Sequence, residues 1–246
     1  MRIVVSSDWH ADHVSSGVDR HEDVKAAAFQ VVKHAVGKKA DAFFFLGDLC
    51  DPDDTFRTLR AVWLAFDVAM MLSAHGVPAW WLGGNHDVIE SGSGASTLHG
   101  LNHGTSLVFE HPTTHLHFGM NLVALPFTAS SHPYDPAKVV RIAAEKIDRE
   151  ERWHLPTLVL SHLHVPGIIP GEETKELARG REVVLPHEEI GKMLGRGEGR
   201  VLVLQGHYHR AQRVVLSGVE ILVAGAVVKL AFGEEENTPS FIDMEV

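Results

Sequence analysis

Residues 42–48 read Ala42-Phe43-Phe44-Phe45-Leu46-Gly47-Asp48, a short unbroken apolar run that ends in a glycine and a carboxylate. The length and the continuous apolarity of this run are typical of a strand that is covered on both faces. The glycine allows the backbone to turn tightly, so that the carboxylate is presented where the strand ends. The segment therefore predicts a buried strand with a ligand-type side chain at its carboxyl end.

The same arrangement occurs four more times along the chain. Short apolar runs lie at residues 3–7, 79–82, 157–160 and 201–204. They are followed by Asp8-Trp9-His10, Gly84-Asn85-His86-Asp87, Ser161-His162 and Gly206-His207-Tyr208-His209. Because the carboxyl ends of neighbouring strands in a parallel or mixed sheet share one edge, ligands gather in the crevice there. We therefore expect these polar residues to lie close together.

Two helical patterns connect the first three of these strands. Residues 22–36 carry apolar side chains on one side and are followed by Gly37. Residues 55–74 carry an apolar stripe that we expect to face the core, formed by Phe56, Leu59, Val62, Trp63, Phe66, Met70 and Met71. Right-handed crossovers would bring the three strand ends to one side of the sheet.

The rest of the chain completes an α/β fold. A helix is expected over 135–151 and a mobile loop over 91–105. Short antiparallel strands are expected at 107–109, 115–118 and 122–125, and a closing antiparallel sheet at 213–216, 220–224, 229–232 and 241–246. Two such mixed sheets packed face to face, with helices outside, predict a four-layer α/β/β/α sandwich in which residues 1–246 form a single domain.

Composition narrows the class of protein. With 246 residues, 45% of them hydrophobic and 22% charged, the chain is typical of a globular protein without a membrane span. An amino terminus that enters a strand at once and a single cysteine, Cys50, predict a cytoplasmic protein. The net charge of -10 argues against a uniformly basic nucleic-acid binder but not against a local basic patch. The 18 histidines favour metal chemistry.

The polar residues at the strand ends form a donor set of oxygen and nitrogen without a thiolate. Such a set favours Mn, Fe or Zn over copper(I) or an iron–sulfur cluster. Asp8 and His10, two apart in an extended segment, point to the same side and could chelate one ion. The Asp48 carboxylate could bridge two cations, and His86 could donate a proton if it stays off the metal. Each motif alone is a weak indication of a metal site. The occurrence of all five, each at the end of a strand-like run, favours a metal site over unrelated turns.

In this order the five motifs resemble those of the calcineurin-like metallophosphoesterase superfamily. The resemblance implies two divalent metal ions, with Mn expected first. One ion would be held by Asp8, His10, Asp48 and His209, and the other by Asp48, Asn85, His162 and His207. It further implies that His86 is the acid that assists the leaving oxygen and that Asp87 orients the His86 imidazole.

Within that superfamily the chain is more closely similar to the SbcD-type nuclease subunit of DNA repair complexes. The similar segments are 7–10, 20–23, 47–51, 161–167, 206–212, 224–227, 232–235 and 240–241. The resemblance implies a DNA exo- or endonuclease that hydrolyses phosphodiester bonds with a metal-activated hydroxide. SbcD-type proteins continue into a DNA-capping domain and a segment for an SbcC-like ATPase, and the resemblance extends only to Val246. DNA is therefore the expected partner, and whether the chain also binds an SbcC-like ATPase is left open.

Candidate substrate contacts lie beside the last motifs. Arg210 and Tyr208 are the two that we select, and Trp9 and Phe127 either stack against a base or pack beside the site. Six arginines flank the last two motifs: Arg179, Arg181, Arg196, Arg200, Arg210 and Arg213. They could line a groove that follows a nucleic-acid backbone, or they could be scattered over the surface and solvated. The alternatives are a phosphomonoesterase, a small-molecule phosphodiesterase acting for example on cyclic nucleotides, and a non-catalytic scaffold with the same fold.

Overall fold

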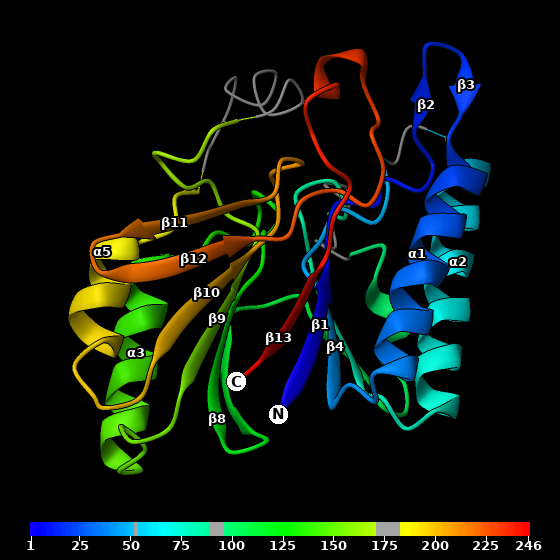
Figure 1. Cartoon of the computed structure of the whole chain (residues 1–246). Coiled ribbons are helices and arrows are strands. Elements are labelled where there is room, and N and C mark those ends of the chain that lie inside the picture. The colour runs from blue at the N-terminus through cyan, green and yellow to red at the C-terminus, as the bar shows by residue number, and fades with distance from the viewer. Residues whose placement is uncertain (52–53, 89–95, 171–182) are drawn as a thin grey trace.

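The computed structural model describes residues 1–51, 54–88, 96–170 and 183–246, and it contains two large sheets (Figure 1). The first has the order β13-β1-β4-β5-β6, with β13 (Ile242–Glu245), β1 (Arg2–Ser6), β4 (Ala42–Phe45), β5 (Ala79–Leu82) and β6 (Ser106–Phe109). Its strands are parallel except for β13, which pairs antiparallel with β1. This sheet carries the first three polar motifs.

The second sheet has the order β11-β12-β10-β9-β8-β7. It is formed by β11 (Gln212–Leu216), β12 (Val219–Val223), β10 (Val201–Gln205), β9 (Thr157–Ser161), β8 (Met120–Leu125) and β7 (Thr113–His117). The four central strands are parallel, and the two edge strands are antiparallel to their neighbours. This sheet carries the remaining two motifs at the ends of β9 and β10.

Helices cover the outer face of each sheet (Figure 1). The first sheet is covered by α1 (His21–Gly37) and α2 (Thr55–Ala74), and the second by α3 (Pro136–Arg149) and the short α5 (His187–Glu189). Smaller elements are the hairpin β2 (Val14–Ser15) and β3 (Val18–Asp19) and the single turns η1 (His99–Leu101), η2 (Ile190–Leu194) and η3 (Phe232–Glu234). The predicted α/β/β/α sandwich of two mixed sheets is confirmed. None of the helices in the described ranges has both the length and the apolarity to cross a membrane.

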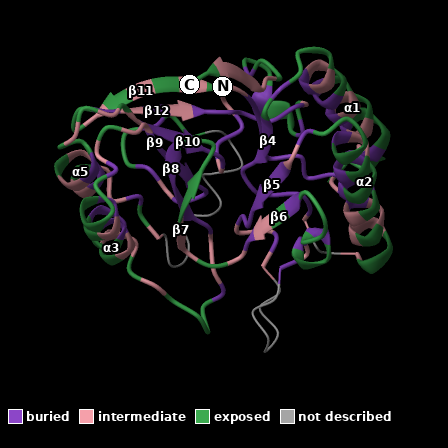
Figure 2. Cartoon of the chain, turned by 90° about the horizontal axis from the view of Figure 1, so that it is seen from below, coloured by how far each residue is buried: buried purple, intermediate pink, exposed green. Residues whose placement is uncertain are grey.

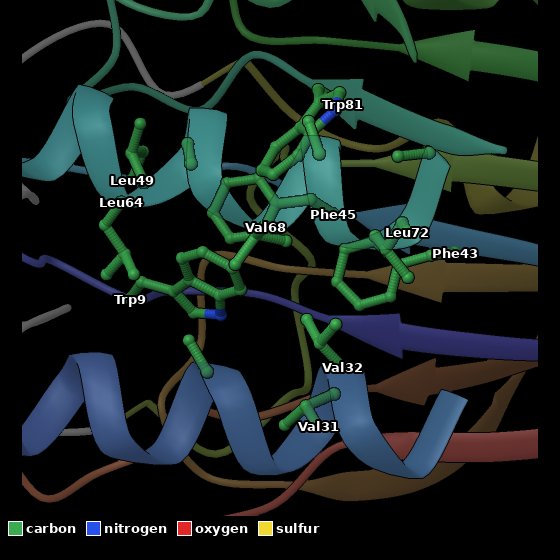
Figure 3. Close-up of a cluster of buried hydrophobic side chains, with 14 of the residues drawn as sticks. Trp9, Val31, Val32, Phe43, Phe45, Leu49, Leu64, Val68, Leu72 and Trp81 are labelled. Carbon is green, nitrogen blue, oxygen red and sulfur yellow. The ribbon is translucent and has the colours of Figure 1, made fainter. Parts of the chain in front are cut away.

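Side-chain alternation along the strands divides the core into three clusters. Phe44 points between the two sheets, where it packs with Trp80 and with residues of β8, β9 and β10. Phe43 and Phe45 point the other way, towards α1 and α2, as expected for successive residues of a strand. Figure 3 shows Phe45 between Trp9 and Trp81, and Phe43 farther along, with side chains of α1 and α2 on either side of these rings. The buried strands between exposed helix faces are visible in Figure 2.

The structure corrects the predicted orientation of α2. The residues that pack on the sheet are Ala61, Leu64, Ala65, Val68, Ala69 and Leu72. The predicted stripe lies largely on the opposite side, where Phe56, Trp63 and Met70 are more than half exposed. This helix is apolar on nearly all sides, so its periodicity is compatible with two buried faces. The face that packs on the sheet is the one with the alanines, whose small side chains let the helix backbone approach the sheet closely.

Three predicted strands also differ from the structure. β6 is parallel to β5 rather than part of an antiparallel set, because the connection between them is long enough to return the chain to the other end of the sheet. Residues 229–232 form no strand, and β13 joins the first sheet rather than closing the second. Of the predicted loop 91–105, residues 91–95 lie outside the described residues, while Ser96 forms a bridge with Val88 and 99–101 form η1.

Asp243 ties β13 to β1 and α1. Arg2 donates to its carboxylate through Nε and Nη2 at 2.7 and 2.9 Å, and His34 Nε2 lies 2.7 Å from it. The hydrogen bond from Arg2 lowers the pKa of Asp243 to about 2, although partial burial opposes this. A carboxyl group whose pKa is depressed by folding stabilises the fold above its unfolded pKa, and this stabilisation is lost as the pH falls through the folded value.

We therefore expect Asp243→Asn to lower the free energy of unfolding at pH 7 by about 1 kcal/mol, a value discounted for solvent screening. The difference from the unsubstituted chain should shrink as the pH falls from about 4 towards 2. Urea unfolding at several pH values measures this. Glu245→Gln on the same strand is the matched control, because its side chain is 78% exposed and lies 3.9 Å from Arg2. A loss that is equal at every pH would contradict the explanation.

Candidate metal centre

The carboxyl ends of five strands meet at one edge, as the sequence predicts. The amide of Asp8 after β1 donates to the carbonyl of Gly47 after β4 at 2.9 Å. The amide of His207 after β10 donates to Asp8 Oδ1 at 3.0 Å, which joins residues 199 positions apart. His162 Nδ1 after β9 lies 2.5 Å from the carbonyl oxygen of Leu46. Both sheets therefore contribute to one cluster of side chains.

Asp8, His10 and His209 form the first group of donors, with ligand atoms that all lie within 4.8 Å of one another. Asp8 Oδ2 is buried and has no hydrogen-bond partner. The Nε2 atoms of His10 and His209 face each other at 3.1 Å. An unpartnered buried carboxylate oxygen is costly, and a cation among these three side chains would satisfy it and both imidazoles. The residues fit a divalent metal ion.

Asp48, His162 and His207 form the second group, again with ligand atoms within 4.8 Å. Asn85 belongs to it, because its Oδ1 lies 3.1 Å from His162 Nε2 and 3.0 Å from His207 Nδ1. The neutral amide oxygen and two imidazoles complement one carboxylate, a set that suits a divalent cation. Every residue that the resemblance assigns to the second metal is therefore brought together.

Asp48 lies between the two groups. Its Oδ2 is 3.1 Å from His162 Nε2 in the second group and 3.8 Å from His10 Nε2 in the first. Burial raises its pKa, but the charges of His162, His86 and His10 outweigh burial and hold the pKa of Asp48 below its usual value. The group therefore stays a carboxylate. This position is the one expected of a bridge between two cations.

The backbone at Gly84 and Gly47 lies very close to the Asp48 carboxylate and the His162 ring. A Cβ on Gly84 would collide with Oδ1 and the backbone nitrogen of Asp48, and a Cβ on Gly47 would lie 2.5 Å from His162 Nδ1. Gly47 also has φ +102°, a conformation that L side chains rarely adopt. The glycines before the polar residues thus allow the two sheets to meet at the site.

Four of the candidate ligands themselves adopt left-handed backbone conformations. The φ angles are 53° at Asp8, 41° at His10, 58° at Asp48 and 74° at His207. Each of these residues directly follows, or lies close to, the end of a strand. The reversal of φ turns the chain sharply, so that the side chain leaves the pleated sheet and points into the cluster.

Asp51 is a functional residue that the sequence analysis did not assign. Its Oδ1 accepts from His10 Nδ1 at 2.8 Å and from His86 Nδ1 at 2.7 Å, and its Oδ2 accepts from His13 Nδ1 at 2.9 Å. A carboxylate on Nδ1 fixes the tautomer of His10, so that Nε2 faces the cluster as a ligand. His13, to which the sequence analysis gave no role, therefore belongs to this site. The signal available was the carboxylate three residues after Asp48.

Glu234 has the same role towards the second imidazole of the first group. Its Oε1 lies 2.5 Å from His209 Nδ1, and its Oε2 accepts from the amide of Leu230 at 2.7 Å. The side chain is 1% exposed and comes from η3, which begins at the last residue of the predicted strand 229–232. The segment Phe232-Gly233-Glu234 was noted only for its resemblance to the SbcD-type family.

His86 lies at the rim of the cluster, with a side chain that is 32% exposed. Burial lowers its pKa, but the negative charges of Asp48 and Asp51 outweigh burial and raise the pKa of His86 to about 10. Among the groups of the chain itself, His86 is therefore protonated at neutral pH. This is the form that a proton donor needs.

The structure corrects the position predicted for Asp87. Its buried carboxylate accepts from the backbone amides of Asp48, Leu49 and Gly84 at 2.8 to 2.9 Å and from Thr97 Oγ1 at 3.2 Å. The carboxylate that contacts the His86 ring is Asp51 instead. The carboxylate of Asp87 therefore stabilises the turn at Asp48, and its hydrogen bonds to these amides point it away from the His86 ring.

Tyr208 is also corrected as a candidate substrate contact. The ring is fully buried in the core of the second sheet, and its hydroxyl accepts from the amide of Val165 at 2.8 Å. The same hydroxyl lies 3.1 Å from Nδ1 of His164, which stays outside the metal groups. Trp9 is buried against Phe45 and Trp81 and packs beside the site.

Of the two arrangements that the sequence left open for the arginines, the described ones adopt the scattered one. Arg200 and Arg213 both pair with Glu220, and Arg196 lies over the Trp153 ring at 5.1 Å. Arg196 and Arg200 precede β10 and so lie at the end of that strand opposite His207. Arg179 and Arg181 lie outside the described residues. Arg210, half-buried directly after His209, is the arginine of this set that stays beside the metal groups.

Solved structures share this fold at low sequence identity. A dimetal phosphatase from Danio rerio aligns with a TM-score of 0.59 and 14% identity over 99% of this chain and 91% of that one. A purple acid phosphatase, PPD1, from yellow lupin (Lupinus luteus) seeds aligns with a TM-score of 0.58 and 14% identity over 99% of this chain and 47% of that one. GAP50, the anchor in the inner membrane complex of Plasmodium, aligns with a TM-score of 0.52 and 14% identity over 99% and 80%.

The sequence itself gives the more specific result. No curated protein matches the chain significantly. The profile of the calcineurin-like phosphoesterase family matches residues 1–211, which contain all five polar motifs. Together with the two adjacent groups of donors, in which Asp48 of the second lies 3.8 Å from His10 of the first, this match shows that the chain belongs to the calcineurin-like phosphoesterases and is a metal-dependent phosphoester hydrolase with a site for two divalent ions.

Proposed function

We propose that the chain is a phosphodiesterase whose substrate is DNA. The observation that carries the proposal is the position of the His86 imidazole, which Asp51 holds at the rim of the cluster, beside the carboxylate of Asp48 that lies between the two donor groups. Diester hydrolysis expels an alkoxide that needs a proton, and a donor placed beside the metal groups supplies it. An ester with a good leaving group, such as a p-nitrophenyl ester, needs this donor less.

The residues of the chain divide the work of this reaction. When bound, two divalent cations lower the pKa of water and neutralise phosphate charge. Asp8, His10 and His209 would hold one, Asn85, His162 and His207 the other, and Asp48 both. Asp51 and Glu234 fix the imidazole orientations through Nδ1, and Asp87 holds the Asp48 turn. His86 donates its proton to the departing oxygen and recovers one from solvent.

The narrower proposal, an SbcD-like nuclease that uses Mn, rests on the segments around the site. Two of the segments that resemble that family, 47–51 and 232–235, contribute Asp51 and Glu234, and both contact a candidate metal ligand. The resemblance therefore concerns residues that orient the metal ligands as well as the ligands themselves. DNA is the substrate to be tested first, and an ATPase partner remains a separate question.

A phosphomonoesterase or a small-molecule phosphodiesterase is the second candidate. The observation that favours it is the engagement of Arg200 and Arg213 with Glu220 and of Arg196 with Trp153, in a chain of net charge -10. A protein that tracks a nucleic-acid backbone needs several free cations along one groove. A small phosphate ester needs the metal groups and one cation such as Arg210.

Substrate comparison separates the two candidates. With Mn present, we expect cleavage of single-stranded DNA and of bis-p-nitrophenyl phosphate, with p-nitrophenyl phosphate and cyclic AMP hydrolysed at least about tenfold more slowly. Arg210→Ala should raise KM for DNA by about fivefold, the equivalent of one lost phosphate contact of about 1 kcal/mol, and leave bis-p-nitrophenyl phosphate unaffected. Arg213→Ala is the matched control, since its side chain pairs with Glu220.

Two results would count against a nuclease. Faster turnover of the monoester or the cyclic nucleotide than of DNA would favour the second candidate. Bound metal without turnover of any ester would favour a non-catalytic scaffold.

A further inference from the structure

A third group of possible metal ligands lies next to the first two. Its members are His10, Asp51 and His86, whose ligand atoms all lie within 4.8 Å of one another. His13 adjoins this group, because its Nδ1 lies 2.9 Å from Asp51 Oδ2. The proposed reaction uses Asp51 to orient His10 and His86, but it gives the His13 imidazole no task. The contact between His13 and Asp51 is therefore left without a role in that reaction.

The two oxygens of the Asp51 carboxylate face different imidazoles. Oδ1 lies 2.8 Å from His10 Nδ1 and 2.7 Å from His86 Nδ1, while Oδ2 lies 2.9 Å from His13 Nδ1. His10 also belongs to the first donor group, where its Nε2 faces His209. A cation bound by Asp51 Oδ2, His13 and His86 would leave the hydrogen bond from His10 to Oδ1 in place. The first donor group would thus keep its geometry.

The chemistry and the spacing of these three side chains suit Zn²⁺. Two imidazoles and one carboxylate are common zinc ligands, and a water molecule would complete a tetrahedral site. Zinc bonds of about 2.0 to 2.2 Å separate neighbouring ligand atoms in such a site by about 3.3 Å. The Nδ1 atoms of His13 and His86 lie 2.9 and 2.7 Å from the Asp51 oxygens. An outward movement of each ring by about half an ångström would therefore admit the ion.

Hydrogen bonds of the backbone hold two of these ligands in place. The amide of His13 donates to the carbonyl of His10 at 2.9 Å, and the carbonyl of His13 accepts from the amide of Arg20 at 3.0 Å. The amide of Asp51 donates to Asp12 Oδ1 at 2.5 Å. Ligands that are already positioned lose little conformational freedom when an ion binds, which favours binding.

The third group is open to solvent, in contrast to the first two. The side chains of His13 and His86 are each 32% exposed, and that of Asp51 is 22% exposed. The side chains of His10 and Asp48 are 5% and 3% exposed. An ion from solution can therefore reach Asp51, His13 and His86 when the first two groups are already filled.

We propose that Asp51, His13 and His86 form a third, weaker site for Zn²⁺, and that the ion bound there inhibits the enzyme. Binding to Nδ1 of each imidazole releases the proton on that nitrogen to solvent, which makes this site weaker than one with preformed free ligands. His86 is then held as a zinc ligand and cannot serve as the proton donor. The inhibition rests on the role of His86 in the proposed function, whereas the binding of the ion does not.

The zinc content of the protein tests the site itself. Equilibrium dialysis against rising concentrations of Zn²⁺ should give three ions per chain, the third bound after the first two. His13→Gln should hold two, because the glutamine amide can keep a hydrogen bond to Asp51 but supplies no imidazole. His99→Gln is the matched control, since His99 and Glu110 form an imidazole–carboxylate pair outside the three groups, and it should hold three. A third ion that persists in His13→Gln, or its absence from the unsubstituted chain, overturns the proposal.

Turnover tests the consequence of binding. Zn²⁺ added to the enzyme in excess Mn²⁺ should lower DNA turnover by about 10²-fold or more, the contribution of a general acid. Turnover of bis-p-nitrophenyl phosphate should fall much less, because p-nitrophenolate leaves without a proton. His13→Gln, compared with its own turnover before zinc is added, should resist the same concentration.

Two results would overturn the inhibitory role. One is equal inhibition of His13→Gln, which would show that zinc acts by replacing Mn²⁺ in the first two groups. The other is a third ion that leaves DNA turnover unchanged. A chain that binds the third ion through His13 but hydrolyses no DNA would refute the proposed function and support the zinc site.

Discussion

Asp48→Asn is expected to remove both bound ions and to lower phosphoester turnover by on the order of 10⁴-fold, the kinetic equivalent of several kcal/mol of lost charge stabilisation. The reason is its position, since Oδ2 contacts a histidine of each donor group. An amide of the same shape keeps the backbone contact from His86 but loses the negative charge that two cations share. Metal content per chain and kcat/KM for bis-p-nitrophenyl phosphate measure the two effects.

Asp41→Asn is the matched control for this substitution. Asp41 lies next to the opposite end of the same strand, where it accepts from the amide of Arg2 at 2.7 Å. The control should bind two ions and retain full turnover. An Asp48→Asn variant with two ions and near-normal kcat/KM would show that the carboxylate between the groups is not a bridge.

His86→Ala is expected to keep both ions and to lose about 10²- to 10⁴-fold in turnover of DNA, the usual contribution of a general acid. The loss should be much smaller for bis-p-nitrophenyl phosphate, because p-nitrophenolate leaves without a proton. This difference between leaving groups is the measurement that identifies a proton donor. Equal losses for both substrates, or loss of metal, would refute the role of His86.

The neighbours of His86 sharpen the comparison. Asp51→Asn should reduce DNA turnover by about 10- to 100-fold through the orientation of His86 and should weaken metal binding through His10. His13→Ala removes a single contact to Asp51 and should change either quantity little. Comparison of Asp51→Asn with His13→Ala tests whether the Asp51 carboxylate orients His10 and His86 or only stabilises the loop around it.

Much of the metal centre could be predicted because its geometry is local to each strand end. Apolar runs such as 42–46 and 201–204 form strands wherever they are covered on both faces, and the residue after the run must then lie at the sheet edge. Asp8 and Asp48 converge because β1 and β4 pair in parallel. His207 follows β10 of the second sheet, so its convergence with Asp8 also requires the two sheets to pack with these strand ends at the same edge.

The remaining features depend on tertiary packing. The buried face of α2 could not be chosen from periodicity, because alanines and large apolar residues alternate around the helix. Asp51 and Glu234 orient histidines that come from other segments, so nothing in their immediate sequence shows the contact. The role expected of Asp87 towards His86 came from the family resemblance, which could not show that the nearest donors to its carboxylate in space are backbone amides.

The left-handed residues at the strand ends have an evolutionary consequence. Each non-glycine residue in that conformation costs on the order of 1 kcal/mol, and Asp8, His10, Asp48 and His207 all adopt it. Glycine would adopt this conformation without that cost, so at these four positions the chain gives up some durability of the fold for side chains that can chelate a cation. Descendants that lost catalysis would be freed from this constraint, and glycines at these four positions would be the first trace of it.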